Sequence, residues 1–371
     1  MRILGEIRAL QAQGYEIVLT TYHNGKDIKN LKIRRIINIP WYKKLDAGSS
    51  WHKLYLDILL LWTSIQTCFK EKPDIIHGHL HEGALIGKVV SVFLSGRKIP
   101  VIFDVQGSLT GELETYGFLR NLRLLKTLFF TLEKLICKLP DYFVCSSESA
   151  TQFIKSKMEV PAHKVTSIID GIYPDFFQCK KDGAFKKQLG LPKSKKIVIY
   201  TGSLMRSKGI DYFLNAIPKI ITQYKNVRFL IVGYPVKPSK ERAKNLKIDD
   251  FVQFAGKVDY FQLPKYLAIA DVAIDPKVDE AGEGSGKIIN YMGAGLPVVC
   301  FDTLNNRTTL PENGFFAKPG DSEDLSKKVV WALKNDALVK SIGEQNRKRV
   351  HENFSWAANG KKLSQIYLNL N

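Results

Sequence analysis

The chain has 371 residues, of which 45% are hydrophobic, and this is enough for two domains with ordinary cores. Lys and Arg number 55 against 36 Asp and Glu, so the formal net charge is +19 and favours anionic partners such as phosphorylated small molecules or anionic lipid. Nucleic acid is not expected as a partner, because the sequence has no long basic run, no zinc-finger spacing and no RNP-like aromatic segment.

The first half of the chain alternates short apolar runs, which predict buried strands, with longer helical patterns. The predicted strands are 15–21, 31–39, 74–77, 101–105, 141–146 and 165–169, and the predicted helices are 51–69 and 118–139. Such alternation predicts a parallel, doubly wound α/β sheet. A polar stretch rich in Lys and Gly, 179–195, predicts a linker.

The strand–helix pattern then starts again and predicts a second domain of the same kind. Its predicted strands are 196–200, 227–232, 251–254, 272–274 and 298–301, and a last helix is predicted near 355–370. We therefore expect domains at 1–180 and 181–353, with 354–371 as a helix that crosses back to the first domain. Two Rossmann-like domains would bind ligands at the carboxyl ends of their strands, in a cleft that both domains face.

The most informative segment is 271–302, which reads as strand, loop, helix, turn and strand. Its loop, Gly282-Glu283-Gly284-Ser285-Gly286, precedes a helix that begins near Lys287. Glycines allow close approach of a ligand, and the helix N-terminus and Lys287 supply positive charge, which suits a diphosphate. Glu283 and Asn290 can bind hydroxyl groups, so the pattern indicates a nucleotide sugar.

Spacing sets aside a P-loop and disfavours a dinucleotide site. Walker A requires Gly and Ser/Thr where this loop has Ala281 and Ile288. A dinucleotide site places its glycines directly after a strand, whereas this loop lies farther from 272–274.

Several segments together resemble the GT-B glycosyltransferases, most closely the retaining family-4 group, over nearly the whole chain. The matching segments are YTGSLMRSKG at 200–209, IVG at 231–233, KIINYMGAGLPVV at 287–299, SSE at 146–148, DG at 170–171 and FSW at 354–356. No single motif decides the family, but their order and spacing are specific.

The resemblance implies a donor site in the second domain. The donor-binding residues would be Gly202, Ser203, Arg206, Lys208, Gly233, Glu283, Gly284, Ser285, Gly286, Lys287 and Asn290. Ser203 stands where the family usually has Arg, so Arg206 is the candidate replacement. Asn290 stands where the family has its second Glu, and Glu283 lies one residue from the expected position of the first.

The acceptor side would lie in the first domain, at His79, His81, Gln106 and Gly107. His77, His79 and His81 alternate along a strand, but no fourth metal ligand is evident nearby, the family is generally metal-independent, and no Asp-x-Asp occurs. We therefore predict no metal and no cofactor. Gln106 replaces a His that family members often carry, and it would orient a sugar hydroxyl.

The first residues differ from the family pattern. Ile3, Ile7 and Leu10 share one helical face, which predicts a helix where the family begins with a strand and a Gly-rich loop. That strand is central in a doubly wound sheet, so we expect that residues upstream are missing from this chain. The alternative is that 1–4 form a shortened strand.

The resemblance predicts a retaining glycosyltransferase that moves a sugar from a nucleotide diphosphate (UDP or GDP type) to a glycan or lipid-linked acceptor. Glu283, Lys208 and Gln106 would be the catalytic residues. The alternatives are a catalytically silent GT-B partner subunit, motivated by Ser203, Gln106 and Asn290, and a sugar-nucleotide epimerase, which the 287–299 block disfavours.

The expected compartment is the cytoplasm. The five cysteines are scattered without a CxxC, no signal peptide is visible, and no apolar run reaches the ~18 residues of a membrane span. Helix 119–139 is amphipathic and basic, so it could rest on an anionic membrane; the alternative is that it covers the first sheet. Its basic residues are Arg120, Arg123, Lys126, Lys134 and Lys138.

Overall fold

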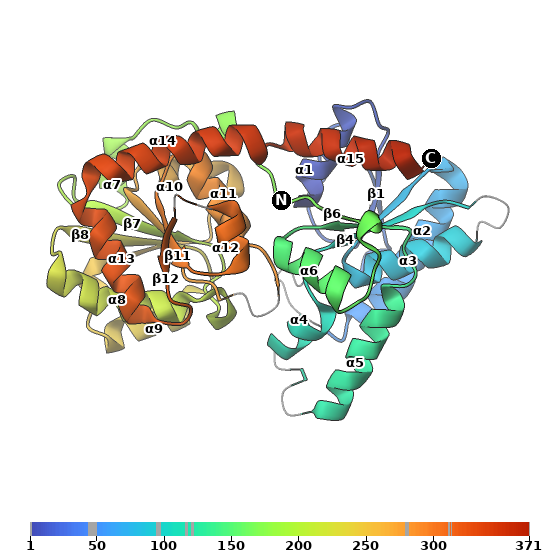
Figure 1. The fold of residues 1–371 in the computed structure, drawn as a ribbon, viewed down its shortest axis with the longest axis horizontal. Coiled ribbons are helices and arrows are strands. Elements are labelled where there is room, and N and C mark those ends of the chain that lie inside the picture. The colour runs from blue at the N-terminus through green and yellow to red at the C-terminus, as the bar shows by residue number, and fades with distance from the viewer. Residues whose placement is uncertain are drawn as a thin grey trace. The chain divides into compact units, whose positions relative to one another are not determined.

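The computed structural model describes residues 2–43, 50–93, 98–115, 118–119, 122–278, 282–310, 312 and 314–370 (Figure 1). The chain divides into two compact α/β units. Unit 1 comprises Met1–Ile169, Glu280–Gly284 and Asn359–Asn371, and unit 2 comprises Asp170–Asp279 and Ser285–Ala358. None of the helices in these described ranges is both long enough and apolar enough to cross a bilayer.

The six strands of unit 1 follow the order that the apolar runs predict, and the unit contains more helices than the sequence patterns predict. Its helices are α1 (Arg2–Gln11), α2 (Lys53–Glu71), α3 (Leu80–Phe93), α4 (Leu109–Thr115), α5 (Arg123–Ile136), α6 (Glu148–Ser156) and the 3₁₀ turn η1 (Ala162–Lys164). Its strands are β1 (Val18–Thr21), β2 (Lys32–Arg35), β3 (Ile76–His79), β4 (Val101–Val105), β5 (Tyr142–Cys145) and β6 (Val165–Ser167).

The strands of unit 1 form two separate parallel sheets, β1-β2 and β3-β4-β5-β6. Among the described residues, β1 pairs only with β2 and β3 pairs only with β4. Residues 2–11 are helical, as the spacing of Ile3, Ile7 and Leu10 predicts, so the alternative of a shortened strand at 1–4 is wrong.

Both faces of the four-stranded sheet are buried, which explains why its strands read as continuous apolar runs. Ile102 and Val144 belong to one cluster, and their neighbours Phe103 and Phe143 belong to the other. The first cluster also contains Leu10 of α1 and Leu363, Ile366 and Tyr367 of α15 (Trp356–Leu370). The end of α15 therefore packs within unit 1.

Unit 2 contains one six-stranded parallel sheet in the order β12-β11-β10-β7-β8-β9 (Figure 1). The neighbours β7 and β10 are the first and fourth strands of the unit, so the order of the strands reverses between them. The strands are β7 (Lys196–Thr201), β8 (Val227–Val232), β9 (Val252–Gly256), β10 (Val272–Asp275), β11 (Val298–Phe301) and β12 (Gly314–Ala317).

The helices of unit 2 cover this sheet and bury its aliphatic and aromatic core. Phe213 and Leu214 of α8 and Val329 of α13 are fully buried against Phe229 and Phe301. The helices are α7 (Gly183–Gln188), α8 (Ile210–Gln223), α9 (Val236–Asn245), α10 (Leu263–Ala268), α11 (Gly286–Gly293), α12 (Leu304–Thr309), α13 (Ser322–Lys334) and α14 (Asp336–Asn353). Short 3₁₀ turns are η2 (Pro174–Phe177), η3 (Arg206–Lys208), η4 (Asp249–Phe251) and η5 (Tyr260–Gln262).

Several predictions of element type are corrected. The predicted linker 179–195 contains the helix α7, which Asp182 caps through its carboxylate. Helix α5 begins at Arg123, five residues later than predicted, and β12 was missed. Strand β12 has only four residues and begins with Gly314, so it carries little apolar signal of its own.

Candidate functional site

The carboxyl ends of β7 and β8 lie against each other through two glycines. Gly202 has φ +123° and Gly233 has φ +156°, and a Cβ on Gly233 would lie 1.8 Å from the Gly202 carbonyl oxygen. The Gly202 N–H donates to the Val232 carbonyl at 2.9 Å. Gly202 therefore contributes an exposed, side-chain-free surface, while its N–H is used within the sheet.

The loop after Gly202 is fixed against the neighbouring strand ends. The buried Tyr200 hydroxyl donates to the Ser203 carbonyl at 2.7 Å. Gly209, with φ +81°, packs so closely on the end of β10 that a Cβ would lie 1.8 Å from the Pro276 carbonyl oxygen. This contact joins the β7 loop to the point where the strand order of the sheet reverses.

Two basic residues of this loop differ in exposure. Arg206 is 92% exposed and lies 2.9 Å from Asp211, so its charge is directed to the start of α8. Lys208 is half-buried in η3. Of the two, Lys208 is the more restricted by its surroundings.

Lys287 lies beside Gly202 and is held by a buried carboxylate. Its Nζ is 2.8 Å from Asp275 Oδ1 and 4.6 Å from the centre of the Tyr200 ring, and its Cε would touch a Cβ on Gly202 at 4.0 Å. Asp275 is completely buried at the end of β10. Asp275 was not among the predicted site residues, although a carboxylate directly after the apolar run 272–274 is an unusual buried residue.

Asn290 lies on helix α11, where it contacts Tyr260. The Tyr260 hydroxyl donates to Asn290 Oδ1 at 3.4 Å. The next residue, Tyr291, is buried, and its hydroxyl accepts hydrogen bonds from the Thr201 N–H at 2.8 Å and the Thr201 hydroxyl at 3.1 Å. Tyr291 thereby fixes α11 to the end of β7.

The glycine-rich loop is shared between the two units. Gly282 to Gly284 group with unit 1, where the Ser147 hydroxyl donates to the Gly282 carbonyl at 2.7 Å. Glu283 lies within that segment, whereas Ser285, Gly286, Lys287 and Asn290 group with unit 2. The predicted donor residues therefore do not all belong to one unit.

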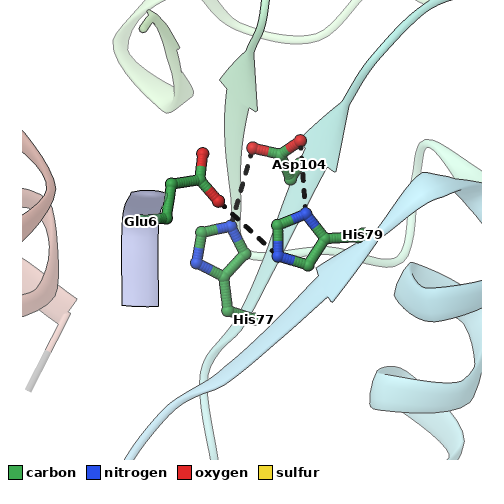
Figure 2. A group of neighbouring side chains, drawn as sticks. All are labelled: Glu6, His77, His79 and Asp104. Carbon is green, nitrogen blue, oxygen red and sulfur yellow. Dashed lines mark ion pairs between the residues drawn. The ribbon is translucent and has the colours of Figure 1, made fainter. Parts of the chain in front are cut away.

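At the carboxyl ends of β3 and β4 in unit 1, four titratable side chains form a cluster (Figure 2). These are Glu6, His77, His79 and Asp104. The two imidazoles are stacked, with ring centres 4.9 Å apart and planes 6° apart. His79 Nε2 is 3.6 Å from Glu6 Oε2, and its Nδ1 is 3.5 Å from Asp104 Oδ1 (Figure 2). The sequence analysis had named His79 alone of these four as a site residue.

Arg2 of α1 dominates the electrostatics of this cluster. Its Nε and Nη2 donate to the Asp104 carboxylate at 2.7–2.9 Å, and its Nε lies 3.0 Å from Glu6 Oε1. Burial opposes ionisation of Asp104, but Arg2 and the two imidazoles outweigh it and hold the pKa of Asp104 well below its usual value. Burial lowers the pKa of His77, and the nearby Asp104 offsets this only in part.

Gln106 is attached to the same cluster. Its Nε2 donates to Asp104 Oδ1 at 3.0 Å and lies 3.4 Å from His79 Nδ1. Asp104 and His79 thereby orient the carboxamide. Gly107, with φ +150°, follows directly and turns the chain toward α4.

His81 lies apart from His77 and His79. It is 5% exposed, its Nε2 is 3.2 Å from Glu133 Oε1, and its ring packs 4.9 Å from the ring of Phe103. The Glu133 carboxylate also accepts the Leu109 N–H at 2.8 Å and both the N–H and hydroxyl of Thr110. His81 thus supports a carboxylate that caps the N-terminus of α4.

Family models match both units. The model described as Glycosyltransferase Family 4 matches residues 2–176, and the model described as Glycosyl transferases group 1 matches residues 182–349. The chain belongs to the group 1 glycosyltransferases. The family resemblance expected from the sequence is confirmed, and a transferase activity on sugars is the activity of this family.

Relatives of this glycosyltransferase include enzymes of envelope polysaccharide synthesis. The capsular polysaccharide glycosyltransferase CapM of Staphylococcus aureus is 22% identical over 98% of this chain and 92% of its own length. The putative teichuronic acid glycosyltransferase TuaC of Bacillus subtilis is 20% identical over 94% of this chain and 85% of its own.

Solved structures confirm the predicted GT-B fold. Sucrose-phosphate synthase from Thermosynechococcus elongatus superposes with a TM-score of 0.81 at 20% identity, covering 100% of this chain and 92% of that one. Anabaena HepE in complex with UDP superposes with a TM-score of 0.75 at 16% identity, covering 98% and 96%.

Proposed function

We propose that this glycosyltransferase transfers a sugar, with retention of configuration, from a nucleoside diphosphate sugar to a glycan or lipid-linked acceptor. One observation carries the donor part of the proposal. At the point where the strand order of unit 2 reverses, the ammonium group of Lys287 lies beside the side-chain-free surface of Gly202. Ligands of doubly wound sheets bind at this position.

The charges in this region suit a diphosphate. Lys287 is fixed by Asp275 and Tyr200, so little side-chain entropy is lost when an anion binds. Lys208, from the neighbouring loop, is a second cation for the same group. The HepE structures contain UDP or UDP-glucose, which supports a uridine donor here.

Asn290 and Glu283 would contact the hydroxyl groups of the donor. Asn290 offers an amide donor and a carbonyl acceptor, and the Tyr260 hydroxyl already orients its Oδ1. We assign Asn290 to the ribose and Glu283 to the transferred sugar. Glu283 lies within the glycine-rich loop and Asn290 on the helix that follows it, so the two side chains can contact different parts of the donor.

The retaining route rests on the resemblance to the retaining family-4 group, and the residue at position 106 is compatible with it. Gln106 has no ionisable group, so it cannot serve as a base for the acceptor hydroxyl. We propose that the leaving diphosphate takes that proton as it departs on the same face, while Lys208 and Lys287 stabilise its charge. Gln106, oriented by Asp104, then positions the acceptor hydroxyl.

A membrane-bound acceptor would fit the surface of unit 1. Leu124, Leu128 and Leu135 of α5 are 88%, 61% and 54% exposed, although the apolar face of this helix could equally have covered the sheet. Arg123, Lys126 and Lys134 accompany them on the same helix. An exposed apolar face with basic residues is typical of helices that lie on anionic membranes.

Helix α2 also exposes apolar side chains. Leu54, Ile58 and Trp62 recur at helical spacing and are 61–68% exposed. Trp51, just before α2, contacts Phe118, which precedes α5, with ring centres 6.1 Å apart. The starts of the two exposed helices are therefore close together in unit 1.

Thermal denaturation with UDP, GDP, ADP, CMP and their sugar conjugates tests the donor assignment. A ligand at about 100 times its dissociation constant adds roughly 2.7 kcal/mol to the free energy of unfolding. We expect one nucleotide series, that of uridine, to stabilise the protein and Lys208→Ala to lose the effect. Lys340→Ala, an exposed lysine of α14, is the matched control.

A folded chain that responds to none of these nucleotides would overturn the donor proposal and favour a silent partner subunit. A nucleotide response without sugar transfer to any lipid-linked or glycan acceptor would separate donor binding from catalysis.

A further inference from the structure

The cluster of Glu6, His77, His79 and Asp104 contains the donor types that bind transition metals. Two imidazoles come from β3, one carboxylate from β4 and one from α1. One ligand atom of each residue lies within 4.8 Å of all the others. The prediction of no metal rested on the family resemblance and on the lack of a further ligand near the histidines in the chain, but the fold brings two carboxylates to them (Figure 2).

The separations between these atoms agree with a shared ion better than with direct hydrogen bonds. His79 Nε2 to Glu6 Oε2 is 3.6 Å and His77 Nε2 to Asp104 Oδ2 is 3.8 Å. Both exceed the usual hydrogen-bond length. A tetrahedral zinc ion with ligand distances of ~2.0–2.2 Å spaces its ligand atoms about 3.3–3.6 Å apart. A small inward movement of the side chains would reach that spacing.

The surroundings of the two imidazoles also suit metal binding. Ligating histidines commonly use their second ring nitrogen to hydrogen-bond an outer partner. His77 Nδ1 is hydrogen-bonded to the Tyr367 hydroxyl at 2.7 Å, which leaves Nε2 directed at the cluster. His79 Nδ1 faces Asp104 Oδ1, and its Nε2 faces Glu6.

Arg2 also belongs to this region, and its positive charge opposes a second cation. It contacts Asp104 through both carboxylate oxygens, but on Glu6 it lies 3.0 Å from Oε1, whereas Oε2 faces His79. We therefore expect Asp104 to be the weakest ligand and partly an orienting group, with His77, His79 and Glu6 carrying most of the coordination. The charge of Arg2 limits affinity, so a strongly bound ion such as Zn²⁺ is favoured over Mg²⁺.

We propose that Glu6, His77, His79 and Asp104 form a binding site for a divalent transition-metal ion, of which Zn²⁺ fits best. A bound ion would join α1 to the ends of β3 and β4, beneath Gln106. The proposal concerns unit 1 alone and does not depend on the donor site of unit 2.

The test is zinc binding to the full chain without an affinity tag, after treatment with a chelator. A Cys179→Ser background removes the one cysteine that is exposed in the described part of the chain. We expect ZnCl₂ to raise the melting temperature by several degrees and MgCl₂ to have no effect, with one zinc ion per chain in a direct titration.

Matched histidine variants decide where zinc binds. His79→Gln and His77→Gln should weaken binding by at least about tenfold, and Tyr367→Phe by about tenfold through loss of the outer hydrogen bond. His163→Gln, an exposed histidine of η1, should bind zinc like the parent chain.

Zinc binding that persists unchanged in the His77→Gln/His79→Gln double variant would overturn the proposal. So would the absence of any zinc effect on the parent chain, which would make the cluster a purely hydrogen-bonded one. Stabilisation by UDP, measured in the same samples, reports on unit 2 separately, so failure of the donor proposal and failure of this one are distinguishable.

Discussion

Both units bury apolar side chains between parallel strands and helices, but their sheets differ. Unit 2 has one continuous sheet of six parallel strands, and its candidate site lies on loops at the reversal of strand order. Unit 1 has two sheets of two and four strands, and its polar cluster lies at the carboxyl ends of β3 and β4 with α1 beside them. In unit 2 the side-chain-free backbone of Gly202 lies at the reversal of strand order. In unit 1 charged side chains lie at the corresponding strand ends.

The difference extends to how charge is held. In unit 2 a single buried pair, Lys287 and Asp275, fixes one cation beside Gly202. In unit 1 the carboxylate of Asp104 is shared among Arg2, Gln106 and the two imidazoles. Substituting one charged residue should therefore change the free energy of unfolding more in unit 2, where no other group replaces the lost partner, than in unit 1.

The largest effect should come from Lys287→Met. It leaves Asp275 buried without its partner, which costs about 3–5 kcal/mol of unfolding free energy. Loss of the cation should also lower kcat by about 10²–10³. Denaturant unfolding and sugar transfer measure the two effects.

The double variant Asp275→Asn/Lys287→Met separates them. It should regain most of the stability, because no charge remains buried, but not the activity. Recovery of activity together with stability would mean that Lys287 has a structural role only.

Unit 1 contains another buried carboxylate, Glu133. Glu133→Gln should lower the free energy of unfolding by about 2–3 kcal/mol, because buried donors of the α4 N-terminus lose their charged acceptor. Burial opposes ionisation of Glu133, but His81 and Thr110 outweigh it and lower its pKa. Its stabilisation is therefore complete above the unfolded pKa of about 4.3 and is lost as pH falls through the lower folded value.

Unfolding free energies measured between neutral and acidic pH check this. The Glu133→Gln variant should show a smaller loss of stability with acid than the parent chain. An identical acid dependence in both proteins would contradict the assignment.

Gly202→Ala tests the side-chain-free surface of unit 2. The positive φ should cost about 1–2 kcal/mol, and the added methyl group beside Lys287 should weaken nucleotide binding. Gly190→Ala is the matched control, since Gly190 also has a positive φ (+72°) but open space around it. Equal nucleotide binding by the two variants would place the diphosphate elsewhere.

The smallest effect on stability should come from Leu124→Gln/Leu128→Gln on α5. Both side chains are exposed, so the unfolding free energy should change by no more than about 0.5 kcal/mol per site. The variant should nevertheless no longer float with vesicles that contain anionic lipid, whereas the parent chain should. Equal flotation of parent and variant would remove α5 from the proposed membrane surface.

The chain alone predicts the alternation of strands and helices, the parallel sheets, Gly202 and Gly233 at strand ends and Lys287 at a helix start. These follow from local signals, namely apolar runs, glycines after strands and residues at a helix start. The strands at 101–105, 227–232 and 298–301 were predicted with the bounds that the structure has. Strand β12 and the start of α5 were not, because tertiary contacts rather than local propensity define them.

Which side chains contact one another could not be predicted from the chain. Asp275 joins Lys287, Glu133 joins His81, and Glu6 and Asp104 join a histidine pair about which the local pattern is ambiguous. The tertiary structure also decided that the leucines of α5 are exposed, since an apolar helical face reads the same whether it covers a sheet or faces outward. In all these cases the energy of burying a group or pairing an ion depends on residues that are near in space but distant in sequence. The local sequence therefore does not predict it.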